Sequence, residues 1–132
     1  MKGLLIAVLV LALVTVAMPA RAADKTVTFQ VPVKVENLDP QVGTIFMRCT
    51  ITGPDYSVTN MSSQIPVRAG VYTGMLSVPV TVLAADLGKV REWHCQLILS
   101  RTGGGPFSEI NNPNNPWSKA APGSVHQVYG QF

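Results

Sequence analysis

The stretch EWHCQLILS, residues 92–100, alternates between apolar and polar side chains with a period of two, as a β-strand with one buried face does. Because neighbouring strand residues project to opposite sides, the alternation puts Cys95 on the inward face and His94 on the outward face. The inward set is Trp93, Cys95, Leu97 and Leu99, and the outward set is Glu92, His94, Gln96 and Ser100. We therefore interpret the adjacent histidine and cysteine as strand residues rather than as one reactive or metal-binding pair.

Working outward from that strand, the same alternation recurs in residues 27–35, 45–51 and 76–82. Weaker signals predict short strands at residues 56–58 and 65–67, a helical turn within residues 84–92 and a last strand within residues 124–132. Pro32 cannot donate a ladder hydrogen bond, so we expect residues 27–35 to form an edge strand. Strands separated by Gly, Pro and Asn turns predict an all-β sandwich or barrel.

The N-terminus has the parts of a secretory signal peptide, which predicts export. Lys2 supplies the positive start, residues 4–18 form an apolar run, and Ala20-Arg21-Ala22 matches a cleavage site. We expect residues 1–22 to be removed and residues 23–132 to fold as one domain, in the periplasm or outside the cell. The apolar run is shorter than the roughly 20 residues of a membrane span, so no stable span is expected after cleavage. Retention of the segment as an N-terminal anchor stays an alternative.

Removal of the signal also changes the charge of the chain. The full sequence has a net charge of +3, from 10 basic and 7 acidic residues. Lys2 and Arg21 leave with the signal, and the remainder has no basic patch that would favour nucleic acid as a partner.

In an oxidising compartment the two cysteines, Cys49 and Cys95, are expected to form a disulfide. Closing the loop of about 47 residues between them would stabilise the fold by about 4 kcal/mol in the chain-entropy model.

The cysteines and their surroundings resemble an immunoglobulin-like or fibronectin-like β-sandwich. Cys49 and Cys95 lie on separate predicted strands with both side chains inward, and Trp93 stands two residues before the second cysteine, after a short helical turn. The resemblance implies an Ig-like antiparallel β-sandwich with Cys49 on strand B, Cys95 on strand F and one inter-sheet disulfide. It gives Trp93 the place of the aromatic corner residue at the core. The resemblance concerns the fold, and a fold does not by itself give a function.

The sequence contains no complete set of catalytic or metal-binding residues. A zinc or copper site needs three or four convergent ligands, and His126 is the only histidine besides His94. Cys95 has Cys49 as a disulfide partner and no base on its own face, so it lacks the activation of a nucleophilic thiol. We therefore predict no catalysis, no metal and no cofactor. A small periplasmic enzyme or metal carrier, built on the two histidines and dispersed carboxylates, stays an alternative.

Residues 102–118, TGGGPFSEINNPNNPWS, are the best candidate for a functional surface. The segment is long for a connection in a small domain and lacks periodicity. Aromatic side chains at loop tips can anchor a partner, which makes Phe107 and Trp117, with Asn112 and Asn115 between them, candidate partner-binding residues. The alternative is that Phe107 and Trp117 fold back to cap the core.

Taken together, these features predict an exported, non-catalytic binding or interaction module for an unknown protein or glycan partner. A second hypothesis is a fimbrial-type structural subunit. In that case the N-terminal strand, residues 27–35, would be donated to the sheet of a neighbour, since strand addition uses main-chain hydrogen bonds and alternate side-chain pockets.

Overall fold

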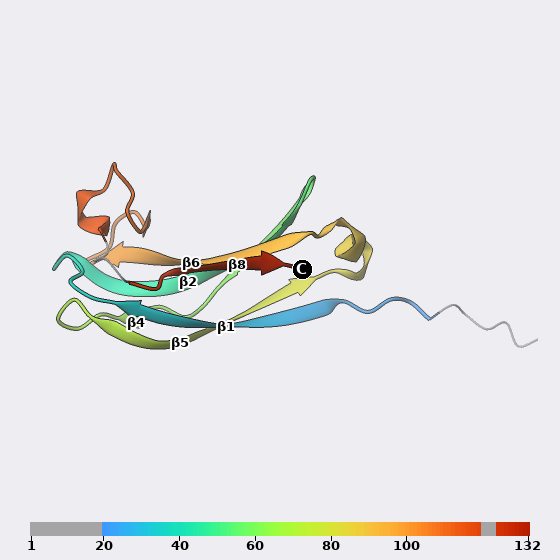
Figure 1. Ribbon diagram of the computed structural model, residues 1–132, viewed down its shortest axis with the longest axis horizontal. Helices are drawn as coiled ribbons and strands as arrows, with labels where there is room; N and C mark the ends of the chain where they lie inside the picture. The colour runs from blue at the N-terminus through green and yellow to red at the C-terminus, as the bar shows by residue number, and fades with distance from the viewer. Residues whose placement is uncertain (1–19, 120–123) are drawn as a thin grey trace, which may run out of the picture.

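Two antiparallel β-sheets packed face to face form the body of the chain (Figure 1). The computed structural model describes residues 20–119 and 124–132, so most of the predicted signal peptide, residues 1–19, lies outside the described residues. One sheet has two strands, β1 (Lys25–Val35) and β5 (Tyr72–Val82), which pair along their full lengths. The all-β architecture predicted from the alternation is confirmed. Within the described residues, no helix has the length and apolar character needed to cross a membrane.

The second sheet has six strands and is built around the pair β2 (Val42–Gly53) and β6 (Glu92–Arg101). β3 (Tyr56–Met61) and β4 (Ile65–Pro66) pair with the edge of β2 that faces away from β6. β7 (Ser108–Glu109) and β8 (Gln127–Gln131) share the far edge of β6. Two short 3₁₀ helices, η1 (Ala84–Lys89) and η2 (Pro116–Ser118), complete the described elements, and η1 is the helical turn that the sequence predicts.

The core lies between the two sheets and is made by the inward residues of the alternating strands. On the long strands the predicted inward faces are confirmed as buried, apart from Val27 and Trp93, which are half-buried. The fully buried side chains include Val31, Val35, Ile45, Met47, Cys49, Ile51, Val78, Val80, Val82, Cys95 and Leu99. Burying a Val, Leu or Ile side chain stabilises a fold by about 1.5–3 kcal/mol. The hydrophobic alternation is therefore the main reason for the two-layer arrangement.

Each strand of the two-stranded sheet has a proline whose backbone faces away from the other strand. Lys34 exchanges backbone hydrogen bonds with Val125, so its N–H and C=O point away from β5. Backbone direction alternates along an antiparallel strand, which turns Pro32 the same way. On β5 the carbonyl of Pro79 accepts from Asn60 Nδ2 at 2.6 Å, so Pro79 also faces outward. The prediction that the first strand is an edge strand is confirmed.

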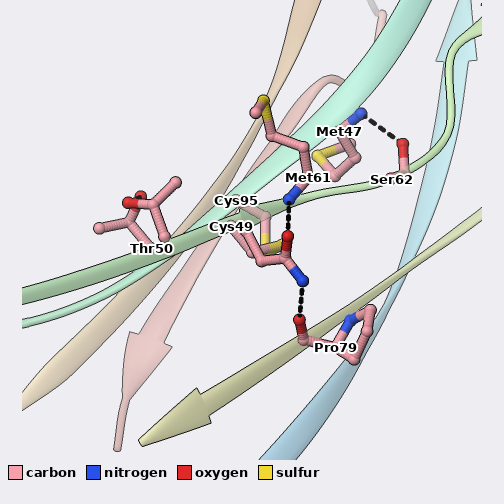
Figure 2. Close-up of a disulfide and its surroundings, with 9 residues drawn as sticks. Met47, Cys49, Thr50, Met61, Ser62, Pro79 and Cys95 are labelled. Atoms are coloured by element: carbon pink, nitrogen blue, oxygen red, sulfur yellow. Dashed lines mark hydrogen bonds between the residues drawn. A yellow bond between two sulfur atoms is a disulfide. The ribbon is translucent and has the colours of Figure 1, made fainter.

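The disulfide lies within one sheet, and the predicted inter-sheet disulfide is wrong (Figure 2). Cys49 and Cys95 are direct cross-strand partners on β2 and β6, with 4.0 Å between their Cα atoms. The short separation is typical of a pair without mutual backbone hydrogen bonds. Cys49 therefore does not lie on a strand of the opposite sheet, as the strand B assignment required. Both residues do point inward, but adjacent strands of one sheet satisfy that pattern as well as two facing sheets do.

Other contacts join the two sheets in place of the disulfide. The rings of Phe29 on β1 and Trp93 on β6 lie 4.8 Å apart between centroids. Asn60 Nδ2 of β3 also donates to the carbonyl of Pro79 on β5, and Figure 2 labels Pro79 at the end of this hydrogen bond. Sheet stacking thus depends on apolar packing and on these side-chain contacts.

Candidate binding surface

The segment 102–118 is folded back on itself by hydrogen bonds around Ser118. This serine is fully buried, and its carbonyl and hydroxyl oxygens accept the backbone N–H groups of Asn111 and Asn112 at 2.9 and 3.0 Å. The backbone N–H of Ser118 donates to the carbonyl of Asn115, and Asn115 Nδ2 donates to Ser108 Oγ at 3.0 Å. A loop held at so many points is an ordered surface feature. Asn112 and Asn115, which the sequence predicts as partner contacts, form hydrogen bonds within the loop.

The three glycines 103–105 start this segment. Their φ angles are +82°, +87° and +143°, values that side chains with a Cβ rarely adopt. The run of positive φ values reverses the chain after β6. In Figure 1 the segment then rises on the side of the six-stranded sheet that faces away from β1 and β5, a side we call the outer face.

The two aromatic residues of the segment have different environments. Trp117 is only 7% exposed, packs with the core residues and has the guanidinium carbon of Arg101 5.8 Å from its ring centroid. Phe107 is 56% exposed and meets the ring of Phe46 edge-on at 5.1 Å. The fold-back alternative therefore describes Trp117, while Phe107 presents most of its ring to solvent. Trp117 holds the segment against the core, and Phe107 keeps most of its ring in solvent.

The outer face beside this loop carries a row of polar side chains that runs across the strands. The row runs from β3 to β8 through the cross-strand pairs Thr59–Thr50, Thr50–His94 and His94–Tyr129. The two threonine hydroxyls are hydrogen-bonded at 2.9 Å, and Tyr129 is 79% exposed. A shallow hollow of about 240 Å³ lies over β6 and β8 and is lined by Glu92, Trp93, His94, Gln127, Tyr129, Gly130 and Gln131.

A small charged network lies between this row and the loop. Arg48 Nη2 contacts Glu109 Oε1 at 2.7 Å, which links β2 to β7 across β6. Hydrogen bonds from the Gln96 side chain and then from Arg48 lower the pKa of Glu109 below its ordinary value. The carboxylate stays charged, and the pair places no net charge on the outer face.

Trp93 is half-buried and packs at the edge of the core. Its indole N–H donates to the carbonyl of Gln131 at 3.1 Å, and its ring lies against Gly130, the cross-strand partner on β8. His94 points outward toward Tyr129, and His126 Nδ1 lies 3.2 Å from the carbonyl of Ser124. Within residues 20–119 and 124–132, no three His, Cys, Asp or Glu side chains gather as metal ligands.

Three further hollows lie elsewhere on the described residues. The first, of about 690 Å³, is lined by residues 21–24 and 83–85, so it includes two residues that the predicted cleavage removes. The second, of about 430 Å³, is lined by Leu38, Asp39, Pro40, Val42, Val67, Ala69 and Gly70. The third, of about 360 Å³, lies on the loop and is lined by Asn111, Asn112, Pro113, Pro116 and Lys119. None of the three brings together side chains with an evident chemical role.

The loop 102–118 was predicted from the sequence as a candidate surface, and the outer face was not. The available signal was the polar half of each alternating strand, and in the last strand it was Tyr129 between Gln127 and Gln131. Comparison of the chain with protein-family models, with curated proteins and with solved structures finds no match.

Proposed function

We propose that this chain is an exported, non-catalytic binding module that works in the periplasm or outside the cell. Phe107 and the neighbouring polar row of the outer face contact a protein or glycan partner. The observation that carries this proposal is the ordered loop, which buries Trp117 and leaves Phe107 exposed. A side chain held on a rigid support loses little conformational entropy on binding, and it therefore makes an efficient anchor.

Two features support export. The Ala22–Ala23 bond that a signal peptidase would cut lies in an exposed segment, two residues before β1 begins. The Cys49–Cys95 disulfide suits an oxidising compartment. Mass spectrometry of the chain purified from the envelope under non-reducing conditions tests both points. Cleavage is contradicted by a chain that keeps residues 1–22, and folding in an oxidising compartment is contradicted by a chain that carries two free thiols.

We further propose that the sandwich is Ig-like, with a strand assignment shifted from the one that the cysteines suggested. In Ig domains strand B pairs with E, while C pairs with F and C′, and F pairs with G. The same pairing order results if β1 is B, β5 is E and β2, β3, β6 and β8 are C, C′, F and G. On this assignment the disulfide joins C to F, which are neighbours in one sheet.

The binding role is tested by exchanging Phe107 for alanine. Mature protein is immobilised and offered separately fractionated envelope polysaccharides and envelope proteins, and the affinity for any retained fraction is measured. We expect Phe107→Ala to weaken binding about tenfold or more, the usual loss at an aromatic anchor. Met75→Ala is the matched control, because Met75 is 59% exposed on the opposite sheet. Equal losses for both variants, or retention of no fraction by the wild type, would contradict the proposal.

A further inference from the structure

The strand β8 has an open edge. The carbonyl of His126 accepts from Leu97 N–H, and Phe132 N–H donates to the carbonyl of Arg91. His126 and Phe132, which flank β8, therefore turn their backbone groups toward β6. Backbone direction alternates, so Gln127, Tyr129 and Gln131 turn their N–H and C=O groups away from β6. In the described part of the chain, no strand pairs with this edge, and the Trp93 indole N–H donates to the carbonyl of Gln131 there.

This edge differs from the other long edges of the fold. Pro32 and Pro79 remove an outward N–H from each edge of the two-stranded sheet. On β3, Asn60 Oδ1 accepts the N–H of Met61 at 2.9 Å. Prolines hinder the addition of a further strand because they lack the N–H that it would pair with. The Asn60 side chain occupies one outward N–H of β3. The outward positions of β8 hold neither proline nor a charged residue.

The three residues of β8 whose backbone groups face the open edge are also arranged symmetrically. The sequence reads Gln127, Tyr129, Gln131 from either end, with Tyr129 at the centre. In an antiparallel pair of two identical strands, a two-fold axis at Tyr129 would bring Gln127 opposite Gln131 of the partner subunit. No like charges meet across such an axis, and every outward N–H of β8 finds a carbonyl.

We propose that two copies of this chain pair through the β8 edges, antiparallel about Tyr129, and so join two six-stranded sheets into one continuous sheet. The interface is isologous, because the same strand serves both subunits. A single short strand buries little area, which makes this a weak, reversible dimer. The site is separate from Phe107, since β8 pairs with the first half of β6 and the loop follows its end.

The backbone pairing is tested first by sedimentation velocity of the mature chain over a wide concentration range. We expect reversible dimerisation of the wild type and of Tyr129→Phe, which keeps the backbone and the aromatic ring. Tyr129→Pro removes an N–H that points away from β6, so the ladder to β6 keeps its bonds while the dimer is lost. A wild type that stays monomeric throughout, or a Tyr129→Pro variant that dimerises normally, overturns the proposal.

A charge exchange tests the register and does not depend on the proline variant folding. In Q127K/Q131K the introduced lysines face each other twice across the axis, and we expect the dimer to weaken about tenfold. In Q127K/Q131E each lysine faces a glutamate, and we expect dimerisation to return to the wild-type level or better. Equal dissociation constants for the two double variants rule out the antiparallel register centred on Tyr129.

Discussion

At the scale of single residues, the pair of Trp93 and Gly130 shows how one side chain positions a strand. A Cβ added to Gly130 would lie 2.7 Å from Trp93 Cζ2 and 2.9 Å from its Nε1. The missing side chain lets the indole pass beneath β8 and reach the carbonyl of Gln131. The same ring contacts Phe29 on the facing sheet. Trp93 therefore joins the last strand to the core, and the contact requires glycine at position 130.

Gly130→Ala should lower the free energy of unfolding by about 1–3 kcal/mol, the usual cost of forcing extra volume into a packed site. Gly88→Ala is the matched control, because an added Cβ there meets nothing within 4 Å, and we expect a change of less than about 1 kcal/mol. Urea denaturation of both variants gives the comparison. In a Trp93→Phe background the Gly130→Ala penalty should shrink, since the smaller ring leaves space. An unchanged penalty there would show that the cost arises elsewhere.

At the scale of elements, the sequence predicts the strands well because their alternation is set by one buried face. β1 and β5 contain the predicted residues 27–35 and 76–82 with the predicted faces inward, and both strands begin earlier than predicted, at Lys25 and Tyr72. The alternation fails for Phe46 and Ile98, which lie on the outer face of β2 and β6 and are nonetheless buried. The Phe107 ring packs on Phe46, and β7 pairs alongside Ile98. Periodicity describes the strand itself and contains no information about a distant segment that covers it.

The loop 102–118 shows the same limit, because nothing in its composition distinguishes the buried Trp117 from the exposed Phe107. Trp117→Ala should cost about 3–5 kcal/mol, the range for removing a buried aromatic side chain. Phe107→Ala should cost about 1 kcal/mol, from the lost edge contact with Phe46. Thermal denaturation followed by circular dichroism separates the two values. Similar small shifts for both variants would mean that Trp117 does not anchor the loop in solution.

At the scale of the whole molecule, strand faces could be predicted from the sequence and strand neighbours could not. Both cysteines are inward, as the alternation requires, yet their pairing depends on β2 and β6 lying side by side. Backbone hydrogen bonds hold β2 to β6 along most of their length, whether or not the sulfur atoms are joined. The disulfide therefore reinforces one existing pair of strands and does not hold the two sheets together.

Replacing both cysteines with alanine should accordingly weaken the fold without changing its architecture. The chain-entropy model gives a loss of about 4 kcal/mol for a loop of this length. A loss of that size would lower the melting temperature by roughly 15 °C in a domain of about 110 residues. Urea denaturation measures the free energy, and amide hydrogen exchange compares protection strand by strand. The disulfide lies within the six-stranded sheet and does not link the two sheets. Its loss should therefore lower the global free energy of unfolding, and amide protection should fall by a similar factor in both sheets. Selective loss of protection in β1 and β5, with β2 and β6 still protected, would instead mean that the disulfide holds the two layers together.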